Sequence, residues 1–239
     1  MRLKGLIVIG TDTGVGKTII CGAIANALAK KDIKLKVFKP FATGSVFKKK
    51  MGAFSEDALF LKKCARSDQP LSEITPCLFK SPLAPAAAGH LERKRVNITR
   101  AKKILCNSID KGYFTLVEGI GGLLVPLTNE FLLADFISDI NLPVLLVSRS
   151  SLGTINHTLL TLYEIGNRNI PLVGVIFNRL NGGKLTLAEK TSPLIIQKFF
   201  KFKNFGMFQY IKDINKEKST PVGLFVRPQK SILQIIHSL

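Results

Sequence analysis

The chain contains few cysteines and histidines, and this scarcity argues against several kinds of site. Its four cysteines (Cys21, Cys64, Cys77 and Cys106) are scattered and form no CxxC pair. This pattern argues against a disulfide framework or a zinc site and favours reduced thiols in a cytoplasmic protein. The three histidines are far apart in the sequence, so a histidine-rich metal site is not expected.

Long apolar runs are also missing. No stretch approaches the roughly 18 consecutive apolar residues of a membrane-spanning helix. The segment Met1–Gly5 leads directly into a strand-like segment, so we expect no signal peptide and no membrane partner. A cytoplasmic location is the corresponding expectation.

Acidic residues are scarce relative to basic ones. The chain has 35 Lys and Arg but 16 Asp and Glu, which gives a formal net charge of +19. Such an excess is compatible with a nucleic-acid surface. The lysines, however, are spread along the chain, and aromatic residues do not interleave with them as they do in single-strand binders. We therefore interpret them as a solvated surface, part of which could serve anionic substrates, and expect no nucleic-acid partner.

Short apolar segments alternate with helical patterns along the chain. The expected strands are rich in Val, Ile and Leu without polar alternation, as in a parallel sheet covered on both faces; they are residues 6–9, 35–38, 115–117, 144–147 and 172–177. Helices are expected at 18–30, 55–65, 99–110, 132–138, 154–167 and 187–200. This order predicts an α/β fold of the P-loop NTPase type, with a doubly wound, mostly parallel sheet flanked by helices. We expect one domain over residues 1–239, and the proline-containing stretch Pro70–Gly89 to be a loop that forms a lid or a substrate wall.

Polar residues and glycines follow directly on the ends of the expected strands. They form clusters at residues 10–18, 39–45, 118–122, 148–156 and 178. Ligands bind beyond the carboxyl ends of the strands in open α/β sheets. The clusters are therefore expected to form one site.

The first of these clusters, Gly10-Thr-Asp-Thr-Gly-Val-Gly-Lys-Thr18, has the character of a phosphate-binding loop. It follows a strand and opens a helix, which is the context that such a loop requires. Gly14 and Gly16 allow the backbone N–H groups to point at phosphate oxygens. Lys17 is expected to reach the β- and γ-phosphates, and the Thr18 hydroxyl to bind Mg²⁺. The spacing is one residue longer than in the usual G-x-x-x-x-G-K-[ST] motif.

Charged residues at two other positions suit the same chemistry. Glu118 ends an apolar strand and is followed by Gly-Ile-Gly-Gly, so it could hold Mg²⁺. Lys39 ends the second strand and would add a positive charge beside the γ-phosphate. Asp57 taken alone is equally compatible with a carboxylate in the first turn of a helix.

Taken together, these segments resemble the dethiobiotin synthetase family. The matching pieces are Gly10–Thr18, Lys39-Pro-Phe-Ala-Thr-Gly44, Ser55-Glu-Asp-Ala-Leu59, Val117-Glu-Gly-Ile-Gly-Gly122, Gly153-Thr-Ile-Asn-His157 and Val175-Ile-Phe-Asn178. They occur in the order of the family, and the lengthened phosphate loop is characteristic of it.

The resemblance implies an ATP-dependent ligase of biotin synthesis. 7,8-Diaminononanoate takes up CO₂ as a carbamate, ATP phosphorylates the carbamate to a carbamic-phosphoric anhydride, and ring closure gives dethiobiotin, ADP and phosphate. Lys17, Lys39 and Thr13 would be catalytic, and Thr18, Asp57 and Glu118 would hold Mg²⁺. The nucleotide would contact Thr13, Gly14, Val15, Gly16, Lys17, Thr18 and Glu118, and Asn178 would bind the adenine edge.

The resemblance also implies a homodimer with the substrate at the subunit interface. Substrate contacts would come from Thr43, Gly121 and Gly122, and from the helix start Gly153, Thr154, Ile155 and Asn156, which the partner subunit supplies in the family.

Three positions depart from the family pattern. Gly14 stands where some members carry glutamate, and Ala86 where many carry histidine. Near residue 206 the family has a Gly-x-x-Pro turn at the base, whereas this chain has Gln209 in place of the proline. From Gln209 we expect weak discrimination between ATP and other nucleoside triphosphates.

Two rival interpretations share the phosphate loop. A cobyrinate-type amidoligase usually carries a glutaminase domain, for which 239 residues leave no room. A ParA- or MinD-like ATPase that binds DNA or a membrane would suit the charge, but such proteins carry an early lysine in K-G-G-x-G-K. This chain has Thr11-Asp12-Thr13 in that place.

Overall fold

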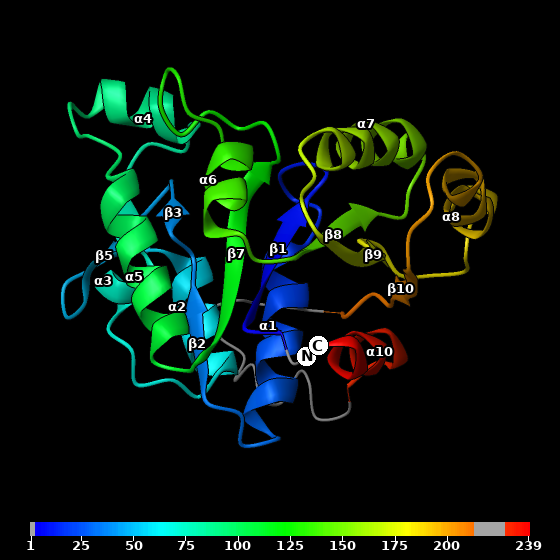
Figure 1. The fold of residues 1–239 in the computed structure, drawn as a ribbon, viewed down its shortest axis with the longest axis horizontal. Coiled ribbons are helices and arrows are strands. Elements are labelled where there is room, and N and C mark those ends of the chain that lie inside the picture. The colour runs from blue at the N-terminus through cyan, green and yellow to red at the C-terminus, as the bar shows by residue number, and fades with distance from the viewer. Residues whose placement is uncertain (1–2, 213–227) are drawn as a thin grey trace.

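The computed structural model describes residues 3–212 and 228–239, and its centre is a six-stranded parallel sheet (Figure 1). The strand order is β10-β9-β8-β1-β7-β2. The strands are β1 (Gly5–Gly10), β2 (Leu35–Phe38), β7 (Phe114–Gly122), β8 (Val144–Arg149), β9 (Leu172–Asn178) and β10 (Asn204–Phe208). The five expected strands are confirmed, and β10 adds an edge strand that the sequence pattern did not reveal.

Helices flank this sheet, so the predicted doubly wound fold is confirmed. The expected helices are α1 (Lys17–Ala29), α2 (Glu56–Cys64), α5 (Ile98–Asp110), α6 (Leu133–Ile140), α7 (Thr154–Asn167) and α8 (Leu187–Phe199). The structure adds α3 (Leu71–Ile74), α4 (Pro85–Leu91) and α10 (Lys230–Ser238). It also adds two small sheets, formed by β3 (Phe41–Ala42) with β6 (Cys77–Leu78) and by β4 (Val46–Lys48) with β5 (Gly52–Phe54).

The expectation of a loop over Pro70–Gly89 was wrong in part. This stretch contains α3 and β6, and α4 begins within it. Pro70 and Ala84 are the N-cap residues of α3 and α4, and Pro85 lies in the first turn of α4. Proline is tolerated at the start of a helix because the first N–H groups have no partner within the helix. The prolines therefore begin short helices here rather than excluding them.

Apolar side chains of the sheet pack into two cores, one on each face. In β1, Leu6 and Val8 belong to the core formed with α1, α2 and α10. The residues between them, Ile7 and Ile9, pack into the opposite core with α5 and α6. Successive side chains of a strand point to opposite faces. Burial of both faces therefore explains why these strands are apolar without interruption.

The two ends of the chain lie side by side near α1 and α10 (Figure 1). The Leu3 N–H donates a hydrogen bond to the Leu239 carbonyl over 3.1 Å. Helix α10 packs against α1 and β10, so the end of the chain covers the first helix. Among the residues that the structure describes, no helix is both long and apolar enough to cross a membrane.

Glu189 links the ends of two central strands to the start of α8. Its side chain accepts hydrogen bonds from the Ser150 hydroxyl at 2.9 Å, from Arg179 Nε at 3.0 Å and from the Thr186 N–H at 2.8 Å. The Thr186 hydroxyl in turn accepts from the Glu189 N–H, which completes a capping box. Hydrogen bonding by the Thr186 backbone, together with Arg179 and Ser150, lowers the pKa of Glu189 from 4.5 to about 2.

We predict that Glu189 stabilises the fold in a pH-dependent way. Because the pKa of the folded state is lowered, the stabilisation is present above the unfolded value near 4.5 and is lost as pH falls toward 2. At pH 7, Glu189→Gln should lower the free energy of unfolding by roughly 1.5–3 kcal/mol, the range for hydrogen bonds to a charged group. The difference from wild type should shrink between pH 5 and pH 3 in urea titrations. Asp139→Asn, at an exposed carboxylate, serves as the control, and a pH-independent difference would contradict the prediction.

Candidate nucleotide and substrate site

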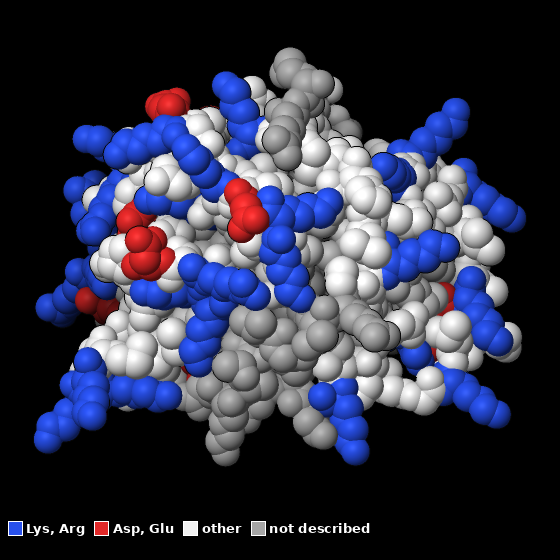
Figure 2. Space-filling view, turned by 90° about the horizontal axis from the view of Figure 1, so that it is seen from below, with Lys and Arg blue, Asp and Glu red and all other residues white. Residues whose placement is uncertain are grey.

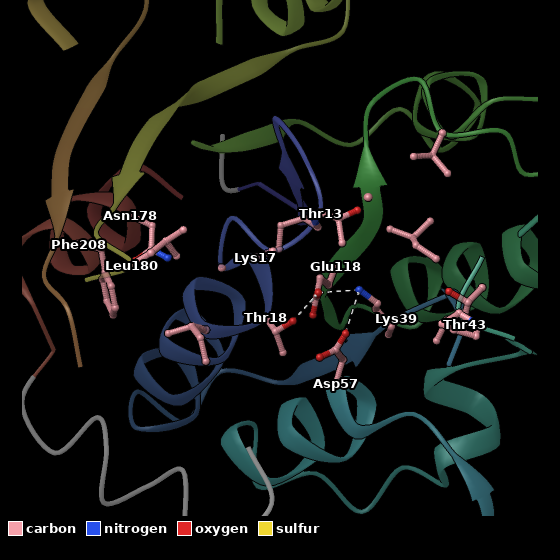
Figure 3. A pocket seen from close by; sticks show the side chains of 18 of the residues that line it. Thr13, Lys17, Thr18, Lys39, Thr43, Asp57, Glu118, Asn178, Leu180 and Phe208 are labelled. Carbon is pink, nitrogen blue, oxygen red and sulfur yellow. Dashed lines mark hydrogen bonds and ion pairs between the residues drawn. The ribbon is translucent and has the colours of Figure 1, made fainter. Parts of the chain in front are cut away.

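A cavity of about 780 Å³ lies at the carboxyl ends of the central strands (Figure 3). Its walls come from the loop between β1 and α1, from the ends of β2, β7 and β9, and from the first turn of α2. Of the residues predicted from the sequence, it is lined by Thr13, Gly14, Gly16, Lys17, Thr18, Lys39, Thr43, Asp57, Glu118, Gly121 and Asn178. Residues from five separate segments thus converge because parallel strands end at the same edge of the sheet.

The phosphate loop has the backbone that its glycines predict. Gly14 and Gly16 have φ angles of 75° and 94°, in the left-handed region that favours glycine. A Cβ on Gly16 would lie 2.0 Å from Asn178 Nδ2, so a larger residue would displace the Asn178 amide. Gly16 is also the N-cap of α1, and no side chain caps the helix. The first N–H groups of α1 are therefore available to an anion.

Lys17 lies at the base of this loop with 6% of its surface exposed. Its Nζ donates to the Asp12 carbonyl over 2.8 Å. Burial, with repulsion from Lys39 as the next cause, lowers the pKa of Lys17 to about 8. A bound polyphosphate would stabilise the charged form, because an opposite charge nearby raises the pKa of a lysine.

Four side chains, that of Glu118 among them, meet at the centre of the cavity. Glu118 Oε1 accepts from the Thr18 hydroxyl at 2.8 Å and from Lys39 Nζ at 2.6 Å. Lys39 Nζ lies 3.5 Å from Asp57 Oδ2. Figure 3 shows the three contacts as a connected set that joins α1, the end of β2, β7 and α2. Asp57, ambiguous from sequence alone, therefore lies beside the other charged residues of the site.

Burial and charge act together on this cluster. Burial alone would lower the pKa of Lys39, but attraction to Glu118 and Asp57 outweighs it and raises that pKa above 10.5. Burial raises the pKa of Glu118, and repulsion from Asp57 adds to the effect against the attraction of Lys39. Lys39 thus remains a cation at neutral pH, close to where a terminal phosphate would lie.

The residues present fit a magnesium ion. Glu118 Oε2 is buried and has no hydrogen-bond partner within the described part of the chain. It is accompanied by the Thr18 hydroxyl and the Asp57 carboxylate, and oxygen ligands of this kind are what Mg²⁺ prefers. Among residues 3–212 and 228–239, no three or more His, Cys, Asp and Glu gather into a complete metal cage. Mg²⁺ typically keeps several waters and binds substrate phosphates, so a sparse set of protein ligands suits it.

The end of the cavity beyond Asn178 includes residues that the sequence analysis did not assign to the site. They are Arg179, Leu180, Phe208, Tyr210 and Ile211, together with Gln209, which was noted only as a departure from the family. Most of them lie at or beyond the end of β10, a strand that was not expected. In the sequence, only their closeness to Asn178 or to Gly206 pointed to a place in the site.

Another part of the cavity wall comes from the segment expected to be a lid or substrate wall. The lining residues from this segment are Pro82, Leu83, Ala84 and Pro85. Ala86 follows them, and its N–H donates to the Pro126 carbonyl over 3.2 Å.

Six predicted site residues do not line the cavity. Val15 is buried behind the loop, and its carbonyl accepts from Asn178 Nδ2 at 2.9 Å. Gly122 lines a second cavity of about 470 Å³ together with Asp12 and His157. Gly153, Thr154, Ile155 and Asn156 line neither cavity. The Thr154 hydroxyl is buried and hydrogen-bonded to the Arg149 carbonyl at 2.6 Å.

Comparisons with known proteins agree with this geometry. A family model described as an AAA domain matches residues 4–218. An ATP-dependent dethiobiotin synthetase from Thermodesulfovibrio yellowstonii is 38% identical over 90% of this chain and 92% of the relative. Proteins of the same name from Endomicrobium trichonymphae and Bacillus subtilis strain 168 are 40% and 34% identical, over 82% and 90% of this chain and 88% and 91% of the relatives.

Solved structures with a similar fold are far less similar in sequence. A ParA family ATPase from Chlorobium tepidum has a TM-score of 0.58 and 14% identity, over 98% of this chain and 97% of that chain. The cell division ATPase MinD from Pyrococcus furiosus has a TM-score of 0.58 and 11% identity, over 98% and 99% of the two chains. At this identity the likeness concerns the fold alone.

Proposed function

The chain belongs to the family of ATP-dependent dethiobiotin synthetases, and from this premise we propose that it converts 7,8-diaminononanoate, CO₂ and ATP into dethiobiotin, ADP and phosphate. The enzyme is a ligase that forms carbon–nitrogen bonds at the expense of ATP. The proposal rests on one observation above all: five charged or hydroxyl-bearing residues line the same cavity, namely Lys17, Thr18, Lys39, Asp57 and Glu118.

The proposed reaction has three balanced steps. One amine of the substrate attacks CO₂ and loses a proton, which gives a carbamate. A carbamate oxygen attacks the γ-phosphorus of ATP, and ADP leaves. The second amine then attacks the carbonyl carbon of the resulting carbamic-phosphoric anhydride and loses a proton, phosphate leaves, and the ring closes.

The positively charged residues serve the second of these steps. The carbamate and the γ-phosphate are both anions and repel each other as they approach. Lys17 in the phosphate loop and Lys39 beside Glu118 supply fixed positive charge in a partly enclosed site, where it stabilises the transferring phosphoryl group without reorganisation. The Thr13 hydroxyl, at the mouth of the loop, would position the carbamate or the phosphate.

A magnesium ion would be held by Thr18, Asp57 and Glu118, where it would neutralise charge on the phosphates. The nucleotide would extend along Thr13–Thr18, with its base against Asn178. Thr43, Gly121 and Gly122 would contact the substrate, toward the wall formed by residues 82–85.

The segment Gly153–Asn156 supports the proposal of a homodimer. These residues do not line the cavity of their own subunit, yet Gly153 is the N-cap of α7 and no side chain caps this helix. The Thr154 N–H donates to the Ser151 carbonyl over 3.2 Å, and the next N–H groups of the first turn suit the substrate carboxylate. Leu152 beside them is 86% exposed, and Leu160 on α7 is 62% exposed. Contact with a second copy across a two-fold axis would cover these residues and bring the helix start to the partner's site.

We also propose a single domain and a cytoplasmic location for this chain. Helices on both faces of one sheet support a single domain over residues 1–239, of which residues 1–2 and 213–227 lie outside the described part. The four free cysteines support a cytoplasmic location.

The alternative of a ParA- or MinD-like ATPase that binds DNA or a membrane is less well supported. Thr11-Asp12-Thr13 has no lysine early in the loop. Figure 2 shows Lys and Arg side chains scattered over the visible face, with Asp and Glu among them, as expected of a solvated basic surface.

We predict that Lys17→Ala abolishes ATP turnover, because the loop loses the cation that contacts the terminal phosphates. ADP release, measured with Mg²⁺, the diamine and bicarbonate, should fall to background. In the wild type, ADP release should require Mg²⁺, the diamine and bicarbonate. Lys103→Ala, at an exposed lysine of α5, is the control. Wild-type turnover by Lys17→Ala would disprove the assignment of the loop.

We predict that Lys39→Met impairs chemistry far more than nucleotide binding. The phosphates keep Lys17, Thr18 and the loop amides, whereas the carbamate loses its main cation. Product formation should fall by about 10² to 10³, the usual effect of removing one preorganised charge-stabilising donor. ATP affinity should stay within about tenfold, or 1.4 kcal/mol.

Calorimetric ATP titration beside a dethiobiotin assay separates these effects. Lys36→Met is a matched control, because Lys36 also pairs with a carboxylate, that of Glu73, but outside the cavity. Thermal melting checks that both variants are folded. Normal turnover by Lys39→Met, or a defect confined to ATP binding, would show that its role is different.

We predict that each active site combines residues of two subunits. Lys17→Ala and Asn156→Asp proteins should each be inactive as homodimers, because Asn156→Asp places a negative charge at the helix start where the substrate carboxylate would bind. Subunits exchanged at equal amounts should recover about a quarter of wild-type activity, because half of the randomly formed dimers contain one intact site out of two. Sedimentation should show a dimer. No recovery on mixing, or a fully active monomer, would refute the shared site.

A further inference from the structure

Arg179 is a buried arginine at the base end of the cavity that neither the phosphate chemistry nor the substrate contacts use. It is 8% exposed and follows Asn178 at the end of β9. Its Nε donates to Glu189 Oε1 over 3.0 Å, so its charge is paired. The rest of the guanidinium remains available for neutral acceptors.

These neutral acceptors belong to both loops that enclose the base end. Arg179 Nη2 donates to the carbonyls of Gly183 at 3.0 Å and Lys184 at 3.4 Å, in the loop after β9. Nη1 donates to Gln209 Oε1 over 3.3 Å, directly after β10. One guanidinium thus joins the loop after β9 to the residue that follows β10, and the Arg179 N–H adds a backbone hydrogen bond to the Phe208 carbonyl at the end of β10.

Gln209 is held from a second side as well. Its backbone N–H donates to Gln229 Oε1 over 2.6 Å, and its carbonyl accepts from Gln229 Nε2 at 3.1 Å. Gln229 is the N-cap of α10. The backbone of Gln209 is therefore fixed by α10 and its side chain by Arg179, while Gln209 itself lines the cavity.

The contact with Arg179 determines which group of the Gln209 amide is free. A guanidinium can only donate hydrogen bonds, so the Gln209 atom that faces it must be the amide oxygen. The amide NH₂ is left for a ligand. A glutamine without such a partner could rotate to offer either group. The expectation of weak base discrimination came from the missing proline and did not include this contact.

Asn178 presents the opposite group. Its Nδ2 donates to the Val15 carbonyl over 2.9 Å, and a carbonyl can only accept. Asn178 Oδ1 is therefore left as an acceptor at the end of β9, beside the cavity. The base end thus combines an acceptor from Asn178 with a donor from Gln209.

We propose that Arg179 is a positioning residue that sets base selectivity, because it holds Gln209 as a hydrogen-bond donor in the cavity that Asn178 lines as an acceptor. This pair complements an exocyclic amine beside an unprotonated ring nitrogen, which adenine and cytosine present. Guanine and uracil present the reverse, a carbonyl oxygen beside a ring N–H. The site therefore selects ATP and CTP over GTP and UTP. The inference rests on the proposed nucleotide site and specifies its base end.

Calorimetric titration of the full-length protein with the four Mg²⁺–nucleoside triphosphates tests this inference. ATP and CTP should bind at least about tenfold more tightly than GTP and UTP, because mismatched groups lose hydrogen bonds and leave polar atoms unpaired. In Arg179→Lys the charge opposite Glu189 remains, but one ammonium cannot replace the fork that holds Gln209. The ratio of ATP to GTP affinity should fall to within about threefold of one.

Three further variants separate positioning from general support of the fold. Gln209→Leu should lose selectivity to the same extent, and the double variant should lose no more, because Arg179 acts through Gln209. Gln209→Glu can still accept from Arg179 but offers only acceptors to the base, so its preference for ATP over GTP should also be lost. Arg168→Lys is the matched control, since Arg168 pairs with Glu164 and Asp135 away from the cavity and should keep wild-type selectivity.

The outcomes are distinguishable. Equal affinities for all four nucleotides in the wild type would overturn the inference while leaving the nucleotide site intact. Uniform weakening of all four nucleotides by Arg179→Lys, with an unchanged ratio, would show a merely structural role and also overturn it. If the wild type bound no nucleotide at all, the proposed function would fail together with the inference.

Discussion

The site is organised around the ion pair between Lys39 and Glu118. Removing two charges from water costs several kcal/mol per ion, and such a pair persists only where close contact and further hydrogen bonds offset that cost. Here the two groups are 2.6 Å apart, the Thr18 hydroxyl donates to the same carboxylate, and the Gly119 carbonyl accepts from Lys39. The pair therefore connects α1, β7 and the end of β2, and it keeps a cation and a carboxylate ready in the same place.

The strand order makes this contact possible. Strand β7 lies between β1 and β2, with Val8 of β1 opposite Glu118. These three strands are adjacent: the phosphate loop follows β1, Lys39 follows β2, and Glu118 lies within β7. Because the sheet is parallel, all three end at the same edge, and their side chains point into the same space beyond it. Segments separated by about a hundred residues in the chain become neighbours without any long loop between them.

A second polar network, around Glu189 and Arg179, organises the other end of the cavity. It connects β8 through Ser150, β9 through Arg179 and the loop after β10 through Gln209. Under the proposed function, the first network would place charge where the phosphates and the carbamate react. The second would fix neutral hydrogen-bonding groups beside the base. Chemistry and base recognition would then depend on different buried ion pairs.

The sequence by itself determined the five central strands, the phosphate loop and the family. Apolar runs and glycine spacing involve residues that are close together in the chain, so they can be recognised without knowing the tertiary structure. It could not show that β10 forms an edge of the sheet, since Asn204–Phe208 is short and contains Gly206. Nor could it distinguish Asp57 from an ordinary acid at a helix start, or give a role to Arg179. Those roles depend on partners distant in the sequence, Lys39 for Asp57 and Gln209 for Arg179, and only tertiary packing brings such partners together.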